Sequence, residues 1–458
     1  MTSVKEQYVI VGAGPVGMYM ACLLSKEGYE VVVFEQREDM RGTELQHGRS
    51  INLSLSTRGI EALMKINAET QAVSEGMPMS ARFVHRCDGT TYTMQYGTNG
   101  ESLISVDRRQ LNELLLNIAE QEYGVKVHFQ HKLIKCDFEN GEIVFERSSD
   151  GTQIPVKIDM IFGCDGAHST VRKEMMRCGR FDYCQTYSKH GYIELIMPAK
   201  EGHKPVLEED FLHIWPKCQF MLIALPNKDK SYTGTFFIPF ETWDQLKTKE
   251  DILNFWDNHF RETIPLIGKD RIVEAVMNKE PLPLITIKCN RYHLGNNCVL
   301  LGDAAHAMLP FYGQGVNCGF EDCEIFHEMM KKYNGDFSLI LPEFSRTRNP
   351  DAKAICDLSE MNYLEMSSKV NCKWFCFRKK VERFLHFVLP WFYIPLYQMV
   401  AFSRIPYSDV LKKQQRQNKI IDGILMAGYG ITGAVVIIGS FIVYKYVNSH
   451  LCTITCLI

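Results

Sequence analysis

The sequence predicts an α/β fold into which a second, mainly antiparallel sheet is inserted, followed by helices and an apolar terminal segment. A strand–helix–strand pattern opens the chain, short β-like runs separated by turns fill about 182–287, and an uncharged stretch occupies 423–444. The 458 residues suffice for one large or two medium domains, each with its own core.

The N-terminal pattern is a βαβ unit. Residues 8–11 read as a short buried strand, 16–26 as a helix that Gly28 ends, and 30–34 as a second strand rich in β-branched residues. Strand, helix and strand in this order predict two parallel strands. Because the first strand begins so near the start, we expect no signal peptide.

A glycine motif joins the first strand to the first helix. Gly12, Gly14 and Gly17 match GxGxxG, in which the first glycine allows a tight turn, the second lets a phosphate approach the backbone and the third lets helix and strand pack closely. The helix N-terminus, around Val16, then offers free N–H groups to a pyrophosphate. Glu35 ends the second strand, where a carboxylate binds an adenosine ribose and repels a 2′-phosphate. The motif therefore predicts a Rossmann-like site for FAD or NAD.

The same spacing recurs at Gly428, Gly430 and Gly433, but inside the apolar terminal stretch. No acid follows at the right distance, and too few residues remain for a βαβ unit. We interpret these glycines as small residues of a membrane helix.

Farther along, 111–122 reads as an amphipathic helix and 125–130 as a strand. Short β-like runs at 192–197, 220–225 and 233–237 predict the inserted sheet. After 299–301 the chain returns to strand, loop and helix. We therefore divide it into a dinucleotide-binding part at 1–181 and 291–345, an inserted sheet at 182–290, a helical region at 346–419 and a terminal segment at 423–444.

Two aspartates follow predicted strands. Asp165 comes after 159–162, and Asp303 comes after 299–301. An Asp at the carboxyl end of a strand points into the crevice where α/β sheets bind ligands. Either residue could instead cap the N-terminus of the next helix. Residues 310–317 then open a helix, with Gly313 and Gly315 on either side of Gln314, so that a flat ring could lie against the backbone and the helix dipole could stabilise negative charge.

These three motifs, in this order, resemble those of the class A flavoprotein aromatic hydroxylases. The resemblance implies an FAD-binding Rossmann-like domain of the glutathione-reductase type with an inserted substrate sheet, and Asp303 at the ribityl chain of FAD. It implies that NADPH reduces FAD without a second dinucleotide domain and that O2 forms a C4a-hydroperoxyflavin, with no catalytic side chain and no metal. The family's positions at FAD match Gly12, Gly14, Val16, Gly17, Glu35, Arg37, Ser54, Arg108, Leu133, Asp165, Thr170, Asp303, Gly315, Val316 and Asn317. Tyr312 and Cys318 depart from the expected Phe and Ala.

Further motifs resemble the branch of this family that hydroxylates L-kynurenine to 3-hydroxykynurenine, in tryptophan degradation and NAD biosynthesis. They lie at 48–53, 181–183, 190–192, 212–216, 344–346, 362–366 and 402–404. The resemblance implies that Arg82 and Tyr96 hold the amino-acid carboxylate and that Asn362 and Tyr397 complete the pocket. A guanidinium suits a carboxylate because it offers two parallel donors. Without the resemblance, Arg82 reads equally well as a surface arginine and Tyr96 as a packed tyrosine.

The terminal segment predicts a membrane anchor. Residues 423–444 carry no charge and, at about 1.5 Å per residue, could cross a hydrocarbon core of about 30 Å. Asp422 and Lys445 bracket the segment, and a basic cluster at 412–419 favours a cytosolic flank. The resemblance implies the mitochondrial outer membrane, with the catalytic part facing the cytosol. A buried core helix is the alternative reading.

Composition narrows the function further. A net charge of −3 argues against a nucleic-acid partner. The sixteen cysteines are scattered without zinc-site spacing, which favours a reducing compartment. Two alternatives stay open. A membrane-associated hydroxylase of quinone precursors would have a neutral pocket, and a non-catalytic prenyl-GTPase escort protein would need neither Asp303 nor the loop at 313–315.

Overall fold

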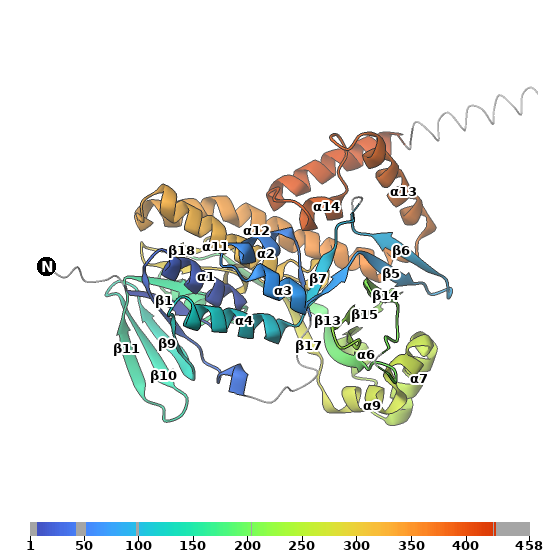
Figure 1. The fold of residues 1–458 in the computed structure, drawn as a ribbon, viewed down its shortest axis with the longest axis horizontal. Helices are drawn as coiled ribbons and strands as arrows, with labels where there is room; N and C mark the ends of the chain where they lie inside the picture. Colours follow the sequence, from blue (N-terminus) through green and yellow to red (C-terminus); the bar gives the residue numbers. More distant parts are fainter. Residues whose placement is uncertain (1–6, 43–51, 98–99, 203, 425, 427–458) are drawn as a thin grey trace, which may run out of the picture.

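The computed structural model describes residues 7–42, 52–97, 100–202, 204–424 and 426 (Figure 1). Two large sheets dominate this part of the chain, and they lie side by side with long helices across one side of the molecule (Figure 1).

The first sheet has six strands in the order β18-β19-β12-β1-β2-β8. Strand β1 pairs in parallel with β2 and with β12, and only the edge pair β18–β19 is antiparallel. The central strands are buried apolar runs because helices and a small sheet cover both faces. The bounds are β1 Gln7–Val11, β2 Glu30–Phe34, β8 Lys126–His128, β12 Met160–Gly163, β18 His293–Leu294 and β19 Cys298–Leu300.

Helix α1 packs against α4 and α11, so these three helices form one layer beside the sheet. The antiparallel sheet β11-β10-β9 lies at the far end of the molecule from α13 (Figure 1). The bounds are α1 Pro15–Lys26, α4 Arg108–Gln121, α11 Gly315–Lys332, β9 His131–Asp137, β10 Glu142–Arg147 and β11 Gln153–Lys157, with the short helices α5 Thr170–Arg177 and α10 Asp303–His306. The βαβ unit lies where the periodicity predicts it.

The second sheet has seven strands in the order β17-β13-β16-β15-β14-β5-β6. Its neighbours are antiparallel except β14 and β5, which are parallel. The bounds are β5 Ala81–His85, β6 Thr91–Gln95, β13 Tyr183–Met197, β14 Phe211–Lys217, β15 Phe220–Pro226, β16 Tyr232–Pro239 and β17 Leu282–Cys289. Strands β5 and β6 lie outside the expected range 182–290. Pairing of β5 with β14 joins segments about 130 residues apart, which local periodicity does not reveal.

Helices between β16 and β17 cover the second sheet and enclose a core around Trp215, Phe236 and Trp256. A small sheet, β3-β7-β4, adjoins α2 and α3. The bounds are α6 Phe240–Trp243, α7 Lys249–His259, α8 Ile264–Ile267, α9 Lys269–Asn278, β3 Leu53–Leu55, β4 Met77–Met79, β7 Leu103–Val106, α2 Thr57–Met64 and α3 Glu69–Glu75.

The chain then continues as helices: α12 Phe337–Ser367, α13 Lys373–Val388, α14 Leu396–Ala401 and a helical stretch at 407–424. Helix α12 contacts both large sheets, and α13 and α14 lie together at one edge of the molecule (Figure 1). Among the described residues, no helix is long and apolar enough to cross a membrane. The expected span at 423–444 falls almost wholly outside them.

Candidate functional site

The turn between β1 and α1 has the geometry that its glycines predict. Gly12 has φ +104, and a Cβ there would lie 2.5 Å from the carbonyl oxygen of Cys164. A Cβ on Gly17 would lie 2.0 Å from the carbonyl oxygen of Gly12, so helix and turn pack backbone to backbone. A Cβ on Gly14 would meet no atom within 4 Å. Gly14 also caps α1 without a side-chain hydrogen bond, so the helix N-terminus at Val16 is open to an anion.

Glu35 is buried directly after β2, and its carboxylate is held by N–H groups of neighbouring residues. Its carboxylate accepts hydrogen bonds from the N–H of Ala13 at 2.8 Å, the N–H of Arg37 at 2.9 Å and the Nε of Arg37 at 2.8 Å. Burial acts to raise the pKa of Glu35, but the Arg37 guanidinium outweighs it and the pKa falls below its usual value. Both residues line a cavity of ≈ 500 Å³. Leu133 is buried in β9 and does not line it.

The two aspartates have different surroundings. The Oδ2 of Asp165 accepts hydrogen bonds from the N–H groups of Thr170 at 2.6 Å and Val171 at 3.1 Å, in the first turn of α5 after its N-cap Ser169, whereas the buried Oδ1 has no hydrogen-bond partner among the described residues. Asp303, by contrast, accepts no hydrogen bond from the described residues and is exposed, yet burial raises the pKa of its carboxyl. This combination is expected of a carboxylate that faces an enclosed space. The charge of Arg108, the first residue of α4, acts to lower this pKa but does not outweigh burial.

The loop before α11 is fixed by Asn317. Its side-chain oxygen accepts from the N–H of Ser56 at 2.9 Å, and its nitrogen donates to the carbonyls of Ser54 at 2.8 Å and Gly313 at 2.7 Å. Both the oxygen and the nitrogen of the buried Asn317 amide are therefore hydrogen-bonded within the protein. The side chain holds the loop in place, and only the backbone of Asn317 is left to contact FAD.

The glycines of this loop leave the start of α11 accessible. Gly313 has φ +63, and a Cβ there would lie 2.9 Å from the Cβ of Ser54. A Cβ on Gly315 would meet nothing within 4 Å, and α11 has no side-chain cap at its N-terminus. Val316, next in the chain, packs only partly against the core.

These features fit a dinucleotide that extends from the N-terminus of α1 to the N-terminus of α11. Two helix N-termini, α1 and α11, lack side-chain caps. Helix α1 follows Gly14 and α11 begins at Gly315, and a Cβ on either glycine would meet no atom within 4 Å. Asp303 comes between these two helices in the chain, and its carboxylate oxygens accept no hydrogen bond from the described residues. The residues present therefore fit FAD: the N-terminus of α1 would hold its pyrophosphate, and the 313–315 loop would hold its ring.

A second group of residues surrounds Arg82 of β5. Its guanidinium is buried and lies 3.3 Å from the Oε1 of Glu365 and 3.3 Å from the Oδ1 of Asn362, both on α12. The Asn362 amide nitrogen donates to the carbonyl of Phe311 at 2.6 Å, which ties this group to the loop before α11. Arg82 is thus a buried residue, which excludes the reading as a surface arginine.

Aromatic rings stack beneath the guanidinium. The Tyr397 ring lies 4.7 Å from the Arg82 guanidinium and is parallel to the Tyr96 ring, also at 4.7 Å. The Tyr312 ring also stacks on Tyr397, with the ring centroids 5.3 Å apart. The Nε of Arg82 and the hydroxyl of Tyr96 are buried and have no hydrogen-bond partner among the described residues. Burial raises the pKa of Tyr96, so its hydroxyl stays protonated and can donate to an anion.

The sequence reasoning missed two charged residues of this site, Glu365 and Lys379. Burial acts to raise the pKa of Glu365, but the charges of Lys379 and Arg82 lower it, so the carboxylate is ionised. The Nζ of Lys379 lies 3.7 Å from Glu365 and 3.2 Å from Glu382. A cavity of ≈ 70 Å³ opens between these groups and is lined by Arg82, Met94, Gln95, Tyr96, Gly97, Glu365, Lys379, Glu382, Arg383, Pro395, Leu396, Tyr397 and Gln398. Nothing in the local sequence marks Lys379, because α13 is basic throughout.

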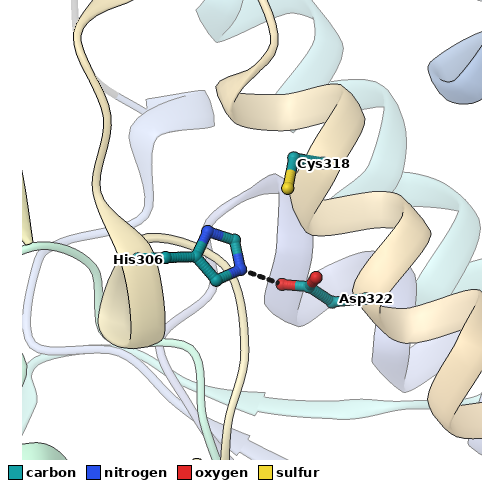
Figure 2. A group of neighbouring side chains, drawn as sticks. All are labelled: His306, Cys318 and Asp322. Atoms are coloured by element: carbon teal, nitrogen blue, oxygen red, sulfur yellow. Dashed lines mark hydrogen bonds and ion pairs between the residues drawn. The ribbon is translucent and has the colours of Figure 1, made fainter. Parts of the chain in front are cut away.

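His306 forms a buried group with Cys318 and Asp322, which lie on the same helix, α11 (Figure 2). The Oδ2 of Asp322 is 2.6 Å from the Nε2 of His306, and its Oδ1 accepts from the Nε of Arg348 at 2.6 Å. Arg348 also donates to the Sγ of Cys318 at 3.1 Å, and burial raises the pKa of that thiol well above its usual value. A buried guanidinium and a protonated thiol do not suit a cation, so this group is a charge network that supports α11.

Comparison with known proteins agrees with this geometry. A family model described as an FAD binding domain matches residues 5–359. A kynurenine 3-monooxygenase of Sus scrofa is 47% identical over 421 residues, covering 92% of this chain and 89% of that protein. A kynurenine 3-monooxygenase of Anopheles gambiae is 42% identical over 440 residues, covering 96% and 90%. The structure of 2-methyl-3-hydroxypyridine-5-carboxylic acid oxygenase superposes with a TM-score of 0.66 at 19% identity, over 80% of this chain and 94% of that one, and shows the fold.

Proposed function

The chain belongs to the kynurenine 3-monooxygenase family of FAD-binding proteins, and we propose that it hydroxylates L-kynurenine to 3-hydroxykynurenine with FAD, NADPH and O2. One structural observation supports this reaction at the site itself. The buried Arg82 is joined to the 310–315 loop, through Asn362 to Phe311 and through Tyr397 to Tyr312. A substrate held by Arg82 therefore lies beside the residues that fit the flavin ring.

The charges around Arg82 match an amino-acid zwitterion. The guanidinium, with its unpartnered Nε, and the Tyr96 hydroxyl can donate to the α-carboxylate of kynurenine. Glu365 is ionised and lies 3.3 Å from Arg82, so it can accept from the α-ammonium group. The described cavity of ≈ 70 Å³ has room for a few waters only, so we expect α13 or the Tyr397 segment to move when substrate enters.

The residues of the chain mainly position the reactants and exclude water. FAD, when bound and reduced by NADPH, supplies the activation of O2, and the aromatic amine of kynurenine makes its ring electron-rich. Arg82 and Glu365 would fix the substrate at its amino-acid end, which directs the ring toward the 313–315 loop. The N-terminus of α11 would stabilise negative charge on the flavin ring when FAD is bound.

The charged pocket argues against the two alternatives. A hydroxylase of quinone precursors requires a neutral pocket, whereas Arg82, Glu365 and Lys379 place three charges in this one. A non-catalytic escort protein would have no need for a carboxylate such as Asp303, which accepts no hydrogen bond from the described part of the chain.

The direct test is NADPH oxidation by the detergent-solubilised, FAD-loaded chain with and without L-kynurenine, with the product identified by mass. Oxidation that depends on kynurenine and yields 3-hydroxykynurenine supports the proposal. A yellow protein that oxidises NADPH without hydroxylating kynurenine would support the assignment as a flavoprotein but exclude kynurenine as its substrate.

We further propose that residues 423–444 anchor the chain in the mitochondrial outer membrane, with the catalytic part facing the cytosol. The uncharged length and the basic cluster of Lys412, Lys413, Arg416 and Lys419 support this proposal. Replacing Val436 and Ile438 by Arg should release the chain from membranes at high-pH carbonate extraction, because each charge costs about 2.5–3.5 kcal/mol at the centre of a span. Retention of the doubly charged variant would exclude a spanning anchor.

A further inference from the structure

Helix α13 and the turn after it expose large aromatic side chains to solvent. Phe387 is 83% exposed, Trp391 77% and Phe384 65%, and among the described large apolar residues only Met426, at 69%, lies in the same range. The exposed set on this segment is Trp374, Phe377, Phe384, Phe387, Val388, Trp391 and Phe392. We call this set the α13 aromatic face.

Single exposed apolar residues are ordinary on a protein surface, but these residues follow one another at helical spacing. Trp374, Phe377, Phe384 and Phe387 are separated by three, seven and three residues, so they lie along one side of α13. The opposite side of the helix contributes Lys379 and Glu382 to the cavity beside Arg82. The aromatic face therefore points away from the protein interior.

Basic side chains accompany the aromatic ones. Helix α13 contains Lys373, Arg378, Lys379, Lys380 and Arg383 but a single acid, Glu382, and that acid is buried. Lys373, Lys380 and Arg383 are exposed beside the aromatic rings. A surface that combines Trp and Phe with Lys and Arg, and presents no exposed carboxylate on the helix, has the chemistry of a helix that lies in the headgroup region of an anionic bilayer.

The position of α13 next to the expected anchor supports the same partner. The Nη1 of Arg378 lies 2.6 Å from the Oδ1 of Asp422, and its Nη2 donates to the Oδ1 of Asn418 at 3.0 Å. Asp422 is the last charged residue before the uncharged stretch that begins at Gly423. If that stretch enters a membrane, the Arg378–Asp422 ion pair holds α13 next to the point of entry.

We infer that the α13 aromatic face is a second membrane contact, lying in the lipid headgroup region and seating the catalytic unit on the bilayer. This inference rests on the membrane attachment proposed above and adds an orientation to it. Because α13 also lines the cavity beside Arg82, seating it would place the substrate pocket close to the membrane surface.

The tryptophans of the chain provide a built-in probe. Of the five, Trp215 and Trp256 are buried and Trp243 is partly buried, whereas Trp374 and Trp391 are the two on the α13 face. The full chain is reconstituted into vesicles of phosphatidylcholine and phosphatidylserine at about four to one, with or without bromine on the acyl chains near the headgroups. Flotation of the vesicles reports attachment, and quenching of tryptophan emission by bromine reports contact.

We expect the bromolipid to lower the emission of the floated protein by roughly a quarter, since two of the five tryptophans lie on this face. Trp391→Phe should remove much of that quenching while flotation persists, and Trp243→Phe, the matched control, should leave the quenching in place.

Protein that floats without quenching would overturn the contact and leave the anchor intact. Protein that does not float would overturn both. Shielding of Trp374 and Trp391 from aqueous acrylamide without quenching by bromolipid would mean that a second copy of the chain covers the face, which also overturns the lipid contact.

Discussion

The guanidinium of Arg82 lies 3.3 Å from the carboxylate of Glu365, although 283 residues separate them in the sequence. Arg82 comes from the edge region of the seven-stranded sheet and Glu365 from the long helix α12. Arg82 is buried and Glu365 half-buried, and Lys379 approaches the same carboxylate from α13. Charged residues of β5, α12 and α13, which are distant in sequence, thus meet at the carboxylate of Glu365. A zwitterionic substrate could exchange its own charges for the contacts that Arg82 and Glu365 make with each other.

Arg82→Ala should weaken kynurenine binding and leave the flavin in place. Loss of one partner of a buried charge pair costs about 2 kcal/mol or more, so KM should rise roughly 30-fold or more. Steady-state kinetics of flavin-saturated protein measure the effect. Arg86→Ala is the matched control, because Arg86 stacks on Tyr92 and donates to Cys376 away from the pocket. An unchanged KM in the Arg82 variant would remove Arg82 from the substrate site.

Asp303→Asn and Asp165→Asn should separate cofactor binding from helix capping. Asp303 accepts no hydrogen bond from the described residues, so its variant should lose about 10- to 100-fold in FAD affinity with little change in apoprotein stability. Asp165 accepts hydrogen bonds from the first two N–H groups of α5, so its variant should lose about 1 kcal/mol of apoprotein stability. Flavin titration and urea unfolding of the apoprotein report the two quantities. The reverse pattern would assign the cofactor role to Asp165.

Two glycine variants test the turn after β1. Gly17→Ala places a Cβ 2.0 Å from a backbone oxygen, so it should cost at least about 1–3 kcal/mol of apoprotein stability. Gly14→Ala has open space around it and should change apoprotein stability by less than about 0.5 kcal/mol. It should nevertheless weaken FAD, because the new methyl group occupies the approach of the pyrophosphate to the backbone. Wild-type FAD affinity in Gly14→Ala would place the pyrophosphate elsewhere.

A histidine pair in the seven-stranded sheet should make the protein sensitive to acid. The Nε2 of His85 lies 3.0 Å from the Nδ1 of His213, whose Nε2 donates to the carbonyl of Glu208 at 2.8 Å, so both rings are neutral. Burial lowers the pKa of His85 to about 3 and that of His213 to about 4. The unfolded chain binds protons near pH 6.5 and the folded chain does not, so stability is complete above about pH 6.5 and declines as pH falls toward about 4.

Urea unfolding of the apoprotein at about pH 7.5 and about pH 5 measures this loss, which is at most about 1.4 kcal/mol per pH unit for each histidine. His85→Phe retains the stacking on Trp215 and removes one proton site, so the difference between the two pH values should shrink. His168→Asn, at an exposed position, should show the wild-type difference. An equal loss in all three proteins would trace the acid sensitivity to other groups.

The sequence by itself determined the parts of this protein whose residues lie close together in the chain. The βαβ unit, the turn at Gly12, Gly14 and Gly17 and the acid at Glu35 follow from local periodicity and fixed spacing, because backbone conformation there depends on neighbouring residues. The strands expected at 30–34 and 220–225 also lie within the observed elements β2 and β15.

Only the tertiary structure decided which polar side chains face a ligand. Asp165 and Asp303 follow strands in the same way, yet one binds the N–H groups of α5 and the other binds no described donor. Asn317 uses its whole amide on Ser54, Ser56 and Gly313. Whether a carboxylate or amide is free depends on the donors that the fold brings to it, and those come from segments whose distance in the chain carries no local signal.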